Sequence, residues 1–147
     1  MSVAISPPWL GALRTYFGVI LLGNLTWEFL HLPLYTIWTT GTWEQRLFAA
    51  VHCTGGDVLI ALASLTLALV LAGERGWTIM SVLVITFGVA YTGFSEWHNV
   101  YVRRTWAYSD WMPTVPIMGH AIGLSPIVQW IMVPGAGLWL ARRAVSQ

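Results

Sequence analysis

Four long apolar segments, separated by short polar stretches, dominate the sequence. They cover residues 15–32, 44–72, 77–102 and 126–141. A membrane-spanning helix needs about 20 residues, so each segment is a candidate span, and the first turns of residues 44–72, a segment longer than the membrane, should project into the interface. Pro33 ends the first segment, because proline cannot continue the helical hydrogen-bond ladder. The pattern predicts an all-α integral membrane protein, in which residues 1–147 form a single transmembrane domain: a four-helix bundle of up-down-up-down topology.

A long loop, residues 103–125, joins the third predicted helix to the fourth. It is rich in tryptophan and proline, so we expect a stiff aromatic loop at the membrane interface, long enough to carry function. Four of the seven arginines lie on the side of the bundle that holds both termini. The positive-inside rule therefore predicts an inner-membrane protein with both termini in the cytoplasm.

The composition narrows the class of partner. The chain is 56% hydrophobic and 9% charged, against about 25% charged residues in an ordinary soluble domain. We therefore expect the lipid bilayer to be the main partner. The net charge of +1, without a basic stripe, argues against nucleic-acid binding. Cys53 is the only cysteine, which excludes an intrachain disulfide.

Costly polar side chains interrupt the apolar segments, and the topology brings them to one side of the membrane, toward the outer leaflet. Glu28 and His31 form a Glu-x-x-His pair, which places a carboxylate and an imidazole on one helix face. Four-helix di-iron carboxylate proteins use the same pair, and such ligands suit iron, manganese or zinc. The predicted metal ligands are Glu28, His31, His52, Asp57, Glu96 and His120. The residues expected to orient these ligands or to contact a substrate are Asn24, Tyr35, His98, Asn99, Arg103, Trp106 and Tyr108.

The leading hypothesis is a metal site that supports an enzyme acting on a lipophilic small molecule, with the metal as Lewis acid or oxygen activator. Copper is a weaker variant, based on Met112, Met118, His120 and Cys53. Haem or quinone binding between pairs of histidines is a further alternative. Another alternative is a non-catalytic accessory or scaffold subunit of a membrane complex, in which the polar network is purely structural. The predicted protein partners are other subunits of such a complex or further copies of this chain. Gln129, Thr86 and Ser81 are interpreted as ordinary polar residues of membrane helices.

Overall fold

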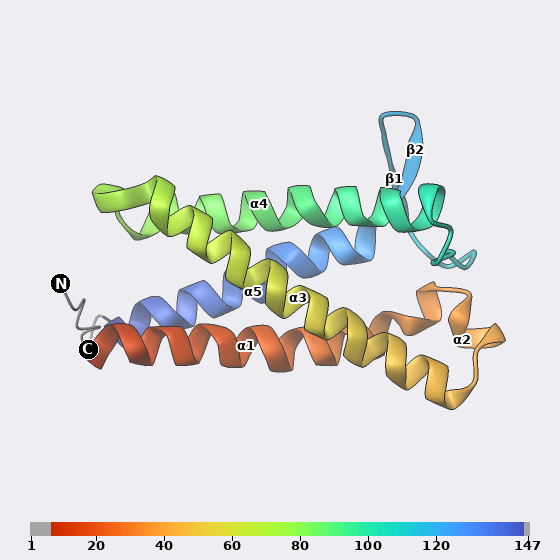
Figure 1. Ribbon diagram of the computed structural model, residues 1–147, viewed down its shortest axis with the longest axis horizontal. Coiled ribbons are helices and arrows are strands. Elements are labelled where there is room, and N and C mark those ends of the chain that lie inside the picture. The colour runs from red at the N-terminus through yellow and green to blue at the C-terminus, as the bar shows by residue number, and fades with distance from the viewer. Residues whose placement is uncertain (1–6, 146–147) are drawn as a thin grey trace.

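Four long helices run side by side and make up most of the molecule (Figure 1). The computed structural model describes residues 7–145. The long helices are α1 (Pro7–His31), α3 (Trp43–Ala72), α4 (Trp77–Trp97) and α5 (Leu124–Val145). Within the described residues, four candidate membrane spans cover Trp9–Leu34, Trp43–Ala72, Trp77–Val102 and Leu124–Val145. The prediction of four helices long and apolar enough to cross a membrane is thus confirmed.

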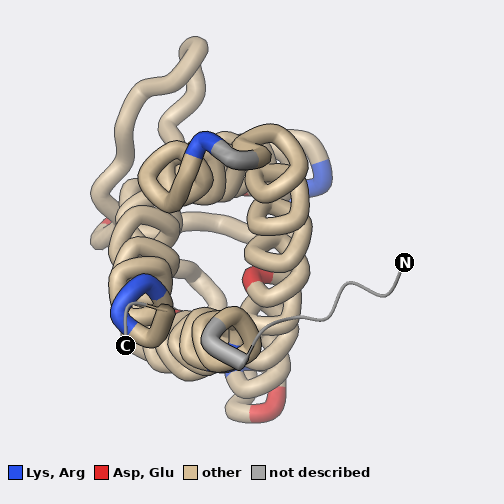
Figure 2. Tube along the Cα trace, turned by 90° about the vertical axis from the view of Figure 1, so that its left-hand side faces the viewer, with Lys and Arg blue, Asp and Glu red and all other residues tan. Residues whose placement is uncertain are grey.

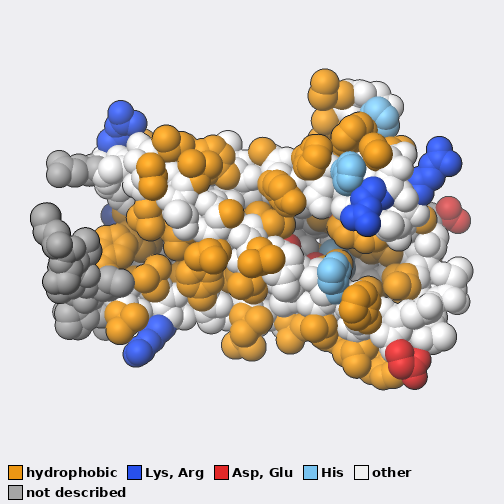
Figure 3. Space-filling model, in the orientation of Figure 1, with side chains coloured by type: hydrophobic (Ala, Val, Ile, Leu, Met, Phe, Trp, Pro, Cys, Tyr) orange, Lys and Arg blue, Asp and Glu red, His pale blue; other side chains and the backbone are white. Residues whose placement is uncertain are grey.

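The surface of these helices is apolar where a bilayer would contact them. Leucine and valine side chains point outward along the spans, for example Leu22, Leu30, Leu59 and Val70, each at least 66% exposed. Charged side chains gather toward the two ends of the bundle (Figure 3). Seen along its length, the bundle is a ring of four helices (Figure 2). This distribution is typical of a protein that lipid surrounds.

Short elements join the long helices. The 3₁₀ turn η1 (Leu32–Leu34), which includes Pro33, and the short helix α2 (Ile37–Thr40) connect α1 to α3. A capping box then starts α3, because the Thr42 hydroxyl accepts from the Gln45 backbone N–H and the Gln45 side chain accepts from the Thr42 N–H. The 3₁₀ turn η2 (Gly73–Arg75) joins α3 to α4. A π-helical turn, η3 (His98–Val102), extends α4.

A β-hairpin occupies part of the predicted loop, which the sequence analysis did not anticipate. Strand β1 (Thr114–Ile117) pairs antiparallel with β2 (His120–Gly123). Met118 and Gly119 form the turn, with φ of 48° and 81°, as a type I′ hairpin turn requires. The usual signal for this turn is Asn-Gly or Asp-Gly, and a Met-Gly pair next to two prolines does not display it.

Glycines allow α5 to pack closely against its neighbours. A Cβ on Gly88 of α4 would overlap the Trp130 ring of α5. A Cβ on Gly137 of α5 would come 3.1 Å from the Tyr16 ring of α1. Trp130 and Tyr16 are among the largest fully buried side chains. The α5 helix is therefore held against both α1 and α4, and this fixes the position of the polar residues that it carries.

Candidate functional site

The Glu28–His31 pair lies at the end of α1, buried against the start of α5. His31 Nε2 is 3.0 Å from Glu28 Oε2, and its Nδ1 is 3.0 Å from Ser125 Oγ. Trp27 Nε1 donates to the same Ser125 Oγ at 3.1 Å. One donor order satisfies these contacts with a neutral imidazole: Trp27 donates to Ser125, Ser125 donates to Nδ1, and Nε2–H donates to the Glu28 carboxylate. Ser125 and Trp27 thus fix the orientation of the His31 ring.

Gln129 of α5 is the centre of a second group of hydrogen-bonded polar side chains. Its Nε2 donates to Asn24 Oδ1 at 3.0 Å and to Glu28 Oε1 at 3.0 Å. The same nitrogen lies 3.1 Å from Asp57 Oδ2, and the other Asp57 oxygen accepts from Trp130 Nε1 at 3.2 Å. A Gln amide has two N–H bonds, so it cannot give each of three acceptors a full hydrogen bond. Gln129 therefore connects carboxyl groups of α1 and α3 through one amide.

Glu96 of α4 is the centre of the third group, under the loop that follows it. Tyr108 donates to Glu96 Oε2 at 2.6 Å, and Tyr35 lies 3.3 Å from both Glu96 oxygens. The Tyr108 oxygen also accepts from the Gly123 backbone N–H at 2.9 Å. Burial, followed by the negative charge of Glu96, raises the pKa of both tyrosines above the ordinary value of 10.0. Both phenols therefore keep their protons and act as donors at neutral pH.

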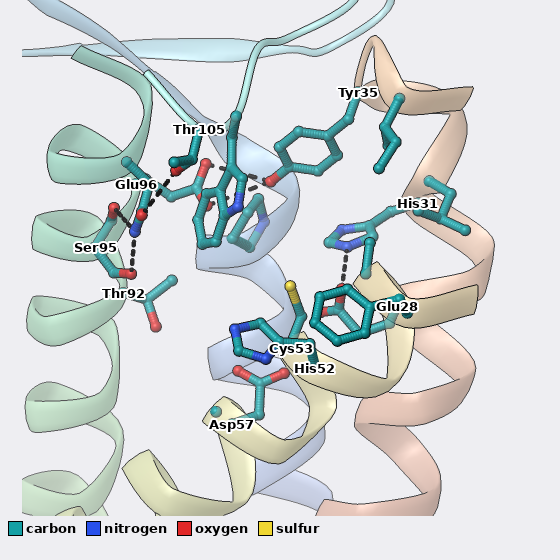
Figure 4. A pocket seen from close by; sticks show the side chains of 18 of the residues that line it. Glu28, His31, Tyr35, His52, Cys53, Asp57, Thr92, Ser95, Glu96 and Thr105 are labelled. Atoms are coloured by element: carbon teal, nitrogen blue, oxygen red, sulfur yellow. Dashed lines mark hydrogen bonds and ion pairs between the residues drawn. The ribbon is translucent and has the colours of Figure 1, made fainter. Parts of the chain in front are cut away.

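These groups surround one cavity of about 990 Å³ (Figure 4). Its lining includes Glu28, His31, Tyr35, His52, Cys53, Asp57, Thr92, Ser95, Glu96, Asn99, Arg103 and Trp106. The Thr92 hydroxyl is buried on this wall and has no hydrogen-bond partner among the described residues. Because a buried donor without a partner is costly, Thr92 marks a place where a polar atom of a ligand would be stabilised.

The charge in this cavity is not balanced by arginine. Within the described residues, the only basic side chain within ion-pair distance of Glu28, Asp57 or Glu96 is that of His31, which contacts Glu28. All three carboxylic residues are at least 90% buried. A single unpaired charge in a membrane span costs about 3 kcal/mol or more. The cavity therefore needs protons, a cation or a ligand to compensate its carboxylates.

The structure does not bring all the predicted ligands together. His52 lines the cavity but stacks on Phe48, with ring centroids 5.3 Å apart. His98 stacks on Phe94, and His120 lies on β2, with its ring 4.7 Å from that of Tyr101. Across residues 7–145, no group of three or more His, Cys, Asp or Glu side chains is arranged to hold a metal ion. The geometry thus gives the metal prediction no support, and it stays a prediction.

The sequence interpretation missed the contribution of α5. Gln129, interpreted as an ordinary polar residue, contacts three polar side chains from two other helices. Ser125, also on α5, contacts His31. The available signal was the isolation of Gln129, since a lone amide deep in an apolar helix needs partners from its neighbours.

The chain was compared with protein-family models, curated proteins and solved structures, and none matches it. The class of protein therefore rests on the features described above. Four membrane-length apolar helices with buried acidic side chains around a cavity define a helical membrane protein.

Proposed function

We propose that this protein binds a lipophilic molecule in the cavity and transfers protons to and from it. The four helices cross the bilayer in up-down-up-down order, with both termini in the cytoplasm. The cavity then lies toward the outer leaflet, under the aromatic loop that follows η3. The observation that carries the proposal is that three buried carboxylic residues, Glu28, Asp57 and Glu96, line one cavity and have no arginine partner within residues 7–145.

Glu28 and Asp57 are the proposed proton-transfer pair. They share the Gln129 amide and lie close enough to interact with each other. A proton shared between two such carboxyl groups relieves their repulsion and stays available for a ligand. His31, held by Ser125, orients Glu28 and exchanges a proton with it.

Isomerisation by proton transfer is the reaction that this pair can complete without a co-reactant. One carboxyl group donates its proton to a carbon of an unsaturated ligand, so that an O–H bond breaks and a C–H bond forms. The other, as carboxylate, then removes a proton from a neighbouring carbon. The ligand regains its composition with a shifted double bond, and the site regains one shared proton.

Deuterium incorporation tests this proposal. The protein, purified in nanodiscs with the lipids of its own membrane, is incubated in D₂O, and the extracted lipids are analysed by mass spectrometry. We expect one lipophile to gain carbon-bound deuterium, which survives extraction into ordinary water. Glu28→Gln and Asp57→Asn should each slow this exchange by about 100-fold or more. Asp110→Asn is the control, since Asp110 is exposed and is not part of the cavity lining.

Two results would overturn the proposal. The first is deuterium exchange that is equal in Glu28→Gln, Asp57→Asn and Asp110→Asn, or absent from all samples including the unmodified protein. The second is a stoichiometric transition metal in the same preparation that Glu28→Gln removes. Elemental analysis detects this metal directly, and its presence would favour the metal-dependent enzyme of the leading sequence hypothesis.

A further inference from the structure

The cavity has a mouth between α3 and α4. Three of its lining side chains are also strongly exposed on the outside of the bundle: Phe48 (68%), Leu59 (67%) and Tyr91 (52%). A side chain that both lines a cavity and faces outward lies at its rim. Figure 3 shows a hollow in this face of the bundle, with acidic side-chain atoms visible inside it. All three rim residues belong to candidate membrane spans, so this part of the mouth opens to the hydrocarbon of the bilayer.

The arrangement of the helices explains the mouth. The α3 and α4 helices lie together near η2 and diverge toward the other end of the bundle (Figure 1). On the far side of the cavity, α5 closes the gap, because Gln129 and Trp130 fill the space between α1, α3 and α4. The α3–α4 side lacks such a helix and stays open.

The loop that follows η3 closes one end of the cavity by bonding to the segment that follows α1. The Thr36 backbone N–H donates to Ala107 O at 2.9 Å, and the Ser109 N–H donates to Leu34 O at 2.9 Å. Between these bonds, Tyr35 and Tyr108 form an isolated β-bridge. The exposed rim at this end is polar, with Glu44, Gln45 and Arg103. The mouth therefore runs from a polar rim at the interface to an apolar rim inside the bilayer.

The lining also restricts the charge of the occupant. Glu28, Asp57 and Glu96 disfavour a phosphate or carboxylate head group inside the cavity. Thr92 is 94% buried, and its hydroxyl, which has no partner among the described residues, is suited to bind a hydroxyl or carbonyl oxygen. We propose that the ligand is a lipophile without a negative charge that carries a hydroxyl or carbonyl oxygen, and that it enters sideways from the bilayer between α3 and α4. This inference rests on the proposed function and specifies its substrate class.

Two adjacent glycines provide a matched test of the entry route. A Cβ on Gly55 or on Gly56 would meet no atom within 4 Å. Gly56 lines the cavity, whereas Gly55 is exposed and does not. The probe is a long-chain alcohol with a diazirine, photo-crosslinked to the protein in nanodiscs and mapped by mass spectrometry. We expect crosslinks on α3 and α4 in the unmodified protein and in Gly55→Phe, and about tenfold fewer in Gly56→Phe.

Additional samples keep the test decisive. If Gly56→Phe does not fold, Gly56→Ala and Gly56→Val replace it, with crosslinking expected to fall as side-chain volume rises. An alcohol of the same chain length should compete with the probe better than a fatty acid, whose carboxylate the acidic lining disfavours. Thr92→Val should remove the preference for the alcohol over a plain hydrocarbon while leaving the crosslinked positions unchanged.

Three results would overturn the inference: equal crosslinking in Gly55→Phe and Gly56→Phe, better competition by the fatty acid than by the alcohol, or an unchanged alcohol preference in Thr92→Val. Glu28→Gln separates this inference from the proposed function. Because that substitution keeps the cavity open, it should retain the crosslinks and lose deuterium exchange. Crosslinks without exchange in the unmodified protein would refute proton transfer alone.

Discussion

Replacing Gln129 with leucine should destabilise the bundle far more than the loss of an ordinary polar side chain in a membrane helix. Gln129 is 2% exposed, and its Nε2 contacts oxygens of Asn24, Glu28 and Asp57. Leucine fills a similar volume but leaves these three acceptors without their donor. Polar contacts between membrane helices contribute about 0.6 kcal/mol on average and about 1.7 kcal/mol at most. Because the two N–H bonds of the amide can make two full hydrogen bonds among these acceptors, we expect a loss of about 1–3 kcal/mol.

Equilibrium unfolding in mixed micelles, with increasing sodium dodecyl sulfate, measures this loss. The control is Thr86→Val, because Thr86 is an exposed polar residue within α4. It should change the free energy of unfolding by less than about 0.5 kcal/mol. If Gln129→Leu lowered the free energy of unfolding no more than Thr86→Val does, Gln129 would not be the centre of a stabilising network. The original interpretation of Gln129 as an ordinary polar residue would then be correct.

Two further predictions concern the packing of α5 and the closure of the loop. Gly88→Ala should lower the free energy of unfolding by about 1–3 kcal/mol, because the added methyl group overlaps the Trp130 ring. Unfolding in mixed micelles measures this change, and an unchanged free energy of unfolding would contradict the close α4–α5 contact. Tyr108→Phe should speed hydrogen–deuterium exchange at the Gly123 amide, because it removes both the acceptor for that amide and the 2.6 Å bond to Glu96. Unchanged exchange at Gly123 would show that the hairpin is held without Tyr108.

The sequence predicted the membrane-length helices well, because length and hydropathy determine them directly. The second predicted segment, residues 44–72, differs by one residue from α3. The Glu28–His31 contact also follows from local spacing, since residues three apart share a helix face. These features depend only on residues that are near one another in the sequence, so the sequence pattern alone is enough to predict them.

The rest of the site depends on contacts between distant segments. The link from His31 to Ser125 joins residues 94 positions apart, and the one from Gln129 to Asp57 joins residues 72 apart. Periodicity places each residue on a face of its own helix but does not fix the rotation of α5 against α1. That rotation is set by packing, for example by Gly137 against Tyr16. His120 was grouped with the carboxylates because the sequence shows no signal for the hairpin; it lies on β2 and does not line the cavity.

The pairing of α1 with α5 has a consequence for biosynthesis. These two helices pack against each other more extensively than any other pair of described elements, and the start of α1 lies beside the end of α5 (Figure 1). During translation, α1 is made before α5, so Glu28 and Asn24 lack Gln129 until α5 is inserted. A chain in which α5 has not yet been inserted therefore lacks a partner for polar side chains of α1, which distinguishes it from the folded bundle for quality-control proteases of the membrane.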